Sequence, residues 1–141
     1  MADYYTKLCY NLPFQGDQQT TFLTLVDRRY SIEFQKHLDD RKIEHTKGES
    51  YCDFEPIGEF VIVTAEEQVN LEVLCEIIRM TLEAHDDDRA LGFEYSLDTN
   101  APASDGCYGG GFAIITRDAF EVISTHEQLQ ARLKSAALVE G

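Results

Sequence analysis

Residues 71–82, LEVLCEIIRMTL, decide the fold of this chain. Their apolar side chains recur at the spacing i, i+3, i+4, i+7 and i+11, which is the pattern of one buried helix face. These side chains are Leu71, Leu74, Cys75, Ile78 and Leu82. Three aspartates follow at 86–88, and carboxylates are disfavoured at the negative end of a helix dipole. The sequence therefore predicts a helix that packs against a larger body and ends near His85.

The chain before this helix has the composition of β-strands. Residues 51–64 are rich in strand-forming residues but are interrupted by Pro56 and Gly58, which predicts two short strands joined as a hairpin. The second of these strands, residues 60–63, is apolar on both faces. That pattern is typical of a strand covered on both sides, or of one whose second face contacts another subunit.

Three strands and a final helix are expected after the long helix. Residues 91–97 alternate between apolar and small or polar side chains, as a half-buried strand does. Residues 112–115 and 120–123 supply two more apolar strands. Ser124 or Thr125 can then cap a last helix that carries Leu129 and Leu133.

The N-terminal part of the sequence predicts one strand and one helix. Residues 4–14 alternate with the period of a half-buried strand. Residues 22, 26, 30, 34 and 38 are apolar at every fourth position, which predicts a helix of about twenty residues. Its second half also alternates at residues 30, 32 and 34, as a strand would. A polar connection, residues 39–50, follows.

The expected element order is therefore β-α-β-β-α-β-β-β-α. Short hairpins among the later strands favour an α+β fold, with a mainly antiparallel sheet and helices packed mostly on one face. Two longer helices and a short C-terminal helix are expected. A length of 141 residues with 43% apolar side chains fits a single domain of residues 1–141.

The composition disfavours several classes of function. The 26 acidic side chains against 12 basic ones give a formal charge of −14, so nucleic acids and anionic lipids would be repelled. No apolar run approaches the roughly 18 to 20 residues of a membrane helix, and the N-terminus does not have the pattern of a secretory signal. The four cysteines form no Cys-x-x-Cys motif, which predicts reduced thiols. We expect a cytoplasmic protein without a membrane partner or direct nucleic-acid binding.

The negative charge is concentrated in the second half of the chain. Residues 50–121 hold sixteen acidic side chains against three arginines, whereas residues 27–49 are neutral. One interpretation is a solvated surface that keeps a small protein soluble. The other is a patch that imitates nucleic-acid phosphates and occupies the basic groove of another protein. The candidate patch residues are Glu72, Glu76, Glu83, Asp86, Asp87 and Asp88.

A turn-rich segment, residues 98–111, is the most unusual part of the sequence and ends in three consecutive glycines. Long ordered loops often carry function. Glycines at the start of a strand cost backbone entropy and offer nothing to pack, so a ligand, a second subunit or a β-bulge would explain them. The candidate ligand-binding residues are Tyr95, Thr99, Asn100, Asp105, Cys107, Tyr108, Gly109 and Gly110.

The same loop offers little reactive chemistry. Cys107 is a candidate nucleophile, but no histidine has a spacing that places a base beside it. Asp98, Asn100 and Asp105 carry oxygen ligands suited to Ca²⁺ or Mg²⁺, but their spacing matches no EF-hand and turn chemistry explains them. The glycines precede a strand, whereas a dinucleotide-binding loop joins a strand to a helix. We therefore expect no catalytic residue, metal site or cofactor.

Three segments of the chain are distinctive when taken together: Ala-Asp-Tyr-Tyr-Thr at residues 2–6, Gly-Phe-Glu-Tyr-Ser at 92–96 and the triple glycine at 109–111. In these segments the chain resembles a family of small acidic proteins carried by phages, plasmids and gene cassettes. The resemblance covers the first strand and residues 91–128, and it implies a fold and a place among mobile-element cargo without assigning chemistry. Such sequences often have Trp before Gly-Phe and Cys-Ser after Thr, where this chain has Leu91 and Asn100-Ala101.

These features favour a protein that acts by binding rather than by catalysis. We expect a homodimer, joined through a sheet face or through the strand that begins with glycine, and a basic protein as a further partner. One alternative is a nucleic-acid-mimicking inhibitor of a host DNA-handling or defence protein. The other is a small-ligand-binding protein or enzyme centred on residues 95–111.

Overall fold

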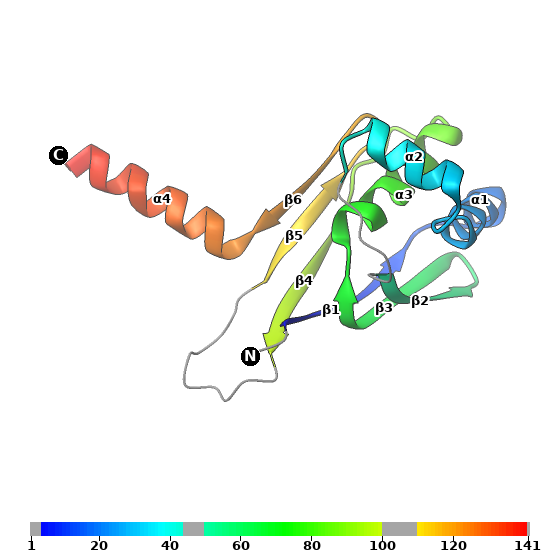
Figure 1. The fold of residues 1–141 in the computed structure, drawn as a ribbon, viewed down its shortest axis with the longest axis horizontal. Helices are drawn as coiled ribbons and strands as arrows, with labels where there is room; N and C mark the ends of the chain where they lie inside the picture. Colours follow the sequence, from blue (N-terminus) through cyan, green and yellow to red (C-terminus); the bar gives the residue numbers. More distant parts are fainter. Residues whose placement is uncertain (1–3, 44–49, 100–109, 141) are drawn as a thin grey trace.

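The computed structural model describes residues 4–43, 50–99 and 110–140, which form an α+β fold (Figure 1). The strands are β1 (Tyr4–Leu12), β2 (Ser50–Ile57), β3 (Phe60–Val69), β4 (Leu91–Thr99), β5 (Gly110–Ile115) and β6 (Phe120–Ser124). The helices are α1 (Gly16–Asp27), α2 (Ile32–Asp40), α3 (Leu71–Ala84) and α4 (Thr125–Glu140). The predicted α+β class is confirmed, and the order matches apart from one additional helix.

All strand pairs in the described chain are antiparallel, and they form one sheet with the order β2-β3-β1-β4-β5-β6. Strand β1 is central because it pairs with β3 along one edge and with β4 along the other. The hairpin predicted around Pro56 and Gly58 is present as β2 and β3. Strands β2 and β6 are the two edges of the sheet.

The inner face of the sheet carries the hydrophobic core. Alternate side chains of each strand point to this face, where Leu12, Val63, Phe93 and Ile115 are buried. Helices α1, α2 and α3 gather on one side of the molecule (Figure 1). Helix α3 is the long helix that the sequence predicts, and its C-cap residue is His85. Its buried apolar side chains are Val73, Leu74, Cys75, Ile77, Ile78 and Leu82.

The opposite, outer face of the sheet stays accessible along much of its width. Its described side chains on β1 and β4 include Cys9, Asn11, Glu94 and Ser96, all exposed. The register places Phe112, Ile114 and Ile123 on this same face. On β3, Val61 and Val63 point to the inner face and are buried, whereas Phe60 points to the outer face and is 42% exposed.

The predicted helix of about twenty residues is two helices, α1 and α2, because Ser31 starts a new helix. Ser31 has extended backbone angles, and its hydroxyl accepts a hydrogen bond from the backbone N–H of Phe34 at 3.1 Å. Tyr30 consequently leaves the apolar stripe and is 52% exposed, whereas Phe34 and Leu38 stay buried. The alternative interpretation of this segment as a strand is wrong.

The C-terminal helix is longer than predicted. Helix α4 has 16 residues and is the longest described helix, rather than a short one. It stands away from the other helices (Figure 1), and it contacts the sheet through β5 and β6. No helix among the described residues has the length and apolar character needed to cross a membrane.

Candidate functional site

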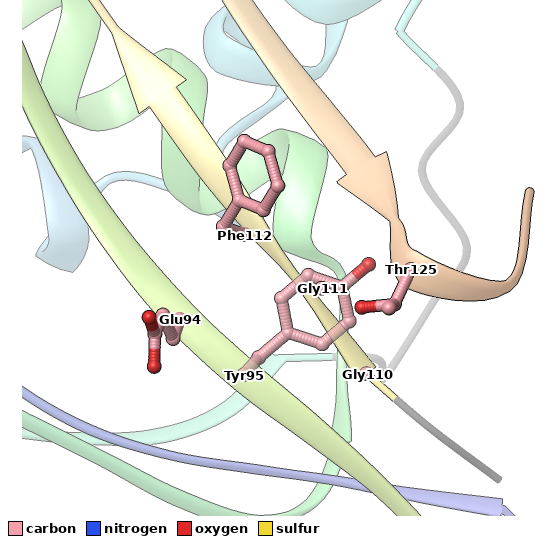
Figure 2. A pocket seen from close by; sticks show the side chains of 6 residues that line it. All are labelled: Glu94, Tyr95, Gly110, Gly111, Phe112 and Thr125. Atoms are coloured by element: carbon pink, nitrogen blue, oxygen red, sulfur yellow. The ribbon is translucent and has the colours of Figure 1, made fainter. Parts of the chain in front are cut away.

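Close contacts between neighbouring strands account for two of the three consecutive glycines. Gly110 lies opposite Ser96, and a Cβ atom on Gly110 would overlap the backbone carbonyl of Tyr95. A Cβ atom on Gly111 would overlap the carbonyl of Ile123 and lie 2.9 Å from Cζ of Tyr95. Figure 2 shows the Tyr95 ring lying over Gly111. Glycine is therefore required here so that a ring and two strands can approach the backbone.

An open pocket of about 360 Å³ lies at this end of the sheet (Figure 2). It is lined by Glu94, Tyr95, Gly110, Gly111, Phe112 and Thr125. The hydroxyl of Tyr95 is directed toward Thr125, at the start of α4, while Glu94 lies opposite Phe112 in the register of β4 and β5. Because neighbouring residues of a strand point to opposite faces, the Tyr95 ring lies on the inner side of the sheet, and the Glu94 carboxylate and the Phe112 ring lie on its outer side. The lining therefore does not gather these groups around one ligand.

The predicted ligand-binding residues are only partly described. Tyr95 and Gly110 line the pocket, and Thr99 ends β4. The other candidates, Asn100, Asp105, Cys107, Tyr108 and Gly109, lie outside the described residues. Glu94, Phe112 and Thr125 were not predicted, because they come together only once the strand register is known.

The predicted acidic patch is divided by the structure. Glu83, Asp86 and Asp88 are exposed at the C-terminal end of α3 and form what we call the α3 acidic end, whereas Glu72, also exposed, lies in the first turn of the helix. Glu76 is completely buried, so its assignment to a surface patch is wrong. The helix face at residue 76 turns toward α2, and a single-helix pattern does not reveal a second helix there.

Two members of the predicted patch are held by arginines. Asp86 forms an ion pair with Arg117. Asp87 is half-buried, and its Oδ2 lies 2.7 Å from Nη2 of Arg89. The same oxygen accepts a hydrogen bond of 2.8 Å from Nε2 of Gln18 on α1. Hydrogen bonds from Arg89, and to a smaller extent from Gln18, hold the pKa of Asp87 well below its ordinary value, against the effect of desolvation.

Glu76 is the centre of an ion-pair network that joins α2 to α3. Its Oε1 lies 2.5 Å from Nε of Arg79, and its Oε2 lies 2.8 Å from Nε of Arg41 and 2.6 Å from Nε2 of His37. Arg79, itself buried, also donates to Glu83 at 3.0 Å and to the carbonyl of Arg117 at 3.0 Å. The carboxylate is thus surrounded by three basic side chains, one from α2, one from the C-cap of α2 and one from α3.

The network keeps Glu76 ionised inside the protein. Burial by itself would raise the pKa of Glu76, but hydrogen bonds from Arg79 and His37 outweigh it and lower the pKa. Every oxygen of the carboxylate is engaged by a donor, so the arrangement suits a structural link rather than proton transfer to a substrate.

The described thiols inside the fold are unreactive. Burial raises the pKa of Cys75 to about 12 and that of Cys52 to about 11, so both remain protonated at neutral pH. Within the described part of the chain, no three histidine, cysteine, aspartate or glutamate side chains gather as a metal site would require.

The outer face carries a second surface that the sequence did not reveal. Phe112, Ile114 and Ile123, which we call the outer apolar strip, lie side by side on β5 and β6, and Ile114 is 43% exposed. Two exposed carboxylates, Glu94 and Glu121, lie opposite members of the strip. The apolar run at residues 112–115 hides this strip in the sequence, because it does not distinguish the two faces of β5.

Substitution of Glu76 tests the buried network. Glu76→Gln removes the buried negative charge that Arg79, Arg41 and His37 share, so we expect a loss of about 3–5 kcal/mol in the free energy of unfolding, measured with urea. Glu83→Gln, at the exposed end of the network, should cost less than about 1 kcal/mol. Equal losses in the two variants would contradict this assignment.

The unfolding free energies of wild type and Glu76→Gln should respond differently to pH. Because the folded-state pKa of Glu76 lies below its ordinary value of 4.5, its contribution is fully present above that pH. The contribution is lost as the pH falls through the lower, folded-state pKa. The stability difference between wild type and Glu76→Gln should therefore shrink in acid.

Substitution of Gly111 tests the close strand contact. Gly111→Ala would place a methyl group against the Ile123 carbonyl and the Tyr95 ring, so we expect a loss of more than about 2 kcal/mol in unfolding free energy. Gly92→Ala on β4, where the nearest atom is the Ala113 carbonyl oxygen at 3.0 Å, is the matched control and should cost less. A Gly111→Ala protein as stable as wild type would refute the contact.

Comparisons with known proteins add no external reference for this site. The chain matches no protein-family model, no curated protein and no solved structure. The resemblance to small acidic proteins of phages, plasmids and gene cassettes therefore stays a prediction. The candidate contact surfaces of the described chain are the pocket, the α3 acidic end and the outer apolar strip.

Proposed function

We propose that this protein is a non-catalytic, cytoplasmic binding protein that forms a homodimer through the outer face of its sheet. The observation that supports the proposal is the outer apolar strip. An antiparallel sheet with one face in water normally alternates between apolar side chains inside and polar ones outside. Phe112, Ile114 and Ile123 depart from that rule on the accessible face.

The apolar character of the outer face extends beyond the strip. At the far end of the sheet, Ile57 and Phe60 lie opposite each other at the tip of the β2–β3 hairpin, and both are exposed. Within the strip, Phe112, Ile114 and Ile123 are neighbours, and contiguous apolar side chains on an accessible face are typical of surfaces that bind other proteins. The carboxylates of Glu94 and Glu121 would then form part of a polar rim around the contact.

We propose a basic protein as the second partner. This chain would compete with a nucleic acid for the basic groove of that protein. The α3 acidic end, formed by Glu83, Asp86 and Asp88, lies on the helix side of the molecule and not on the outer face of the sheet. A chain with a net charge of −14 attracts a basic groove over a long range and orients it during docking. Inhibition of a host DNA-handling or defence protein by imitation of phosphates would use this end.

Self-association can be measured by light scattering after gel filtration. At micromolar concentration we expect twice the 16.0 kDa of one chain. Ile114→Lys places a charge in the outer apolar strip and should yield monomers, whereas Thr24→Lys, on an exposed position of α1, should not. A wild-type monomer under these conditions would refute the homodimer.

Binding of a basic partner can be tested by capture from a lysate at two salt concentrations. We expect a protein that is retained at about 50 mM salt, lost at about 500 mM, and displaced by added duplex DNA. Glu83→Gln with Asp88→Asn, at the α3 acidic end, should weaken the capture. Asp17→Asn with Asp40→Asn removes the same charge from exposed positions of α1 and α2 and is the control. Capture that is insensitive to salt and DNA would count against phosphate mimicry.

A further inference from the structure

Helix α4 presents an apolar stripe that its own chain leaves open. Leu129 and Leu133 are 53% and 55% exposed. The i, i+3, i+4 and i+7 spacing places Leu129, Arg132, Leu133 and Ala136 on one face of the helix. In Figure 1 the helix projects beyond β6, away from α1, α2 and α3. The stripe therefore needs a surface from elsewhere.

The outer apolar strip is an accessible apolar surface that can receive this stripe. It combines the ring of Phe112 with Ile114 and Ile123, and Gly92 lies opposite Ile114. Because Gly92 has no side chain, it leaves room beside Ile114 for an incoming side chain. A helix that inserts apolar side chains into an apolar surface is a common mode of recognition.

The charges of the two surfaces are complementary as well. Exposed Glu94 and Glu121 lie beside the outer apolar strip. The charged side chains of α4 whose placement is described are Arg132 and Lys134, and both are exposed. Arg132 shares the leucine face. A helix laid on the strip would thus bring a guanidinium near carboxylates while its leucines cover the isoleucines.

We infer that α4 of one chain lies across the outer face of a second copy, so that the two copies exchange their C-terminal helices. The inference rests on the proposed homodimer and specifies the two surfaces that form its contact. A helix of 16 residues is about 24 Å long, and six strands about 4.8 Å apart span about the same distance. Thr125 begins α4 directly after Ser124 ends β6, so the helix has no linker with which to fold back onto its own sheet. A second copy has no such constraint.

The test uses variants of exposed residues, which leave the core intact. Leu129→Glu with Leu133→Glu should raise the dimer dissociation constant by roughly tenfold or more, measured by sedimentation equilibrium. Gln130→Glu with Ala131→Glu adds the same two charges on the other side of α4 and should leave the dimer unchanged. Ile114→Glu removes the receiving surface and should also yield monomers.

Mixing the two defective proteins identifies the exchange. In a mixed pair, the intact α4 of the Ile114→Glu chain can bind the intact strip of the Leu129→Glu, Leu133→Glu chain, so one contact of two is restored. We therefore expect a heterodimer from two monomeric proteins. Contacts between two helices or between two sheets would give no restored contact, and the absence of a heterodimer would overturn the inference.

The outcomes separate the inference from the proposed function. A wild-type dimer that persists in the α4 variant would refute the helix exchange and keep the homodimer. A wild-type monomer would refute both. A monomer whose α4 is instead needed to retain a foreign protein would also overturn the inference, because the occupant would then not be a second copy.

Discussion

The structure depends on one constraint, which is that an antiparallel sheet has two faces and α1, α2 and α3 gather on one side of it. Those helices bury the inner side chains of β1, β3, β4 and β5 and form the core. Packing three helices together also brings α2 against α3, where the Glu76 network satisfies the charges that become buried. The remaining helix, α4, is the only described one left to stand away from the body, while the outer face stays accessible.

Periodicity was enough to predict the elements whose burial is one-sided and local. The apolar stripe at residues 71–82 predicted α3, and the aspartates that follow predicted its end at His85. Both signals depend only on residues that are close together in the sequence. The break at Ser31 was missed because an apolar stripe can continue across two helices, and the capping hydrogen bond to Phe34 decides between them. The burial of Glu76 was missed for a different reason, because it depends on His37 and Arg41 from another helix.

The candidate site was predictable only where a residue type is itself unusual. Consecutive glycines marked Gly110 as a position of close approach, and the structure supplies the Tyr95 carbonyl as the group that approaches it. The Tyr95 ring approaches the neighbouring Gly111. Glu94, Phe112 and Thr125 are ordinary residues that meet through strand register, a property of the fold rather than of any local pattern. The same holds for the outer apolar strip, which combines Phe112 and Ile114 of β5 with Ile123 of β6. The apolar runs of these two strands do not show which side chains share a face.

Because of the net charge, added salt should change the affinities of the two proposed contacts in opposite directions. Two copies that each carry −14 repel one another over a distance comparable to the Debye length, so their apolar and helix contacts must act against a long-range opposing force. Added salt screens that repulsion and favours self-association through leucine and isoleucine side chains. A basic partner at the α3 acidic end is attracted by the same charge, so salt weakens that contact instead. The sign of the salt dependence therefore tells which surface a given complex uses.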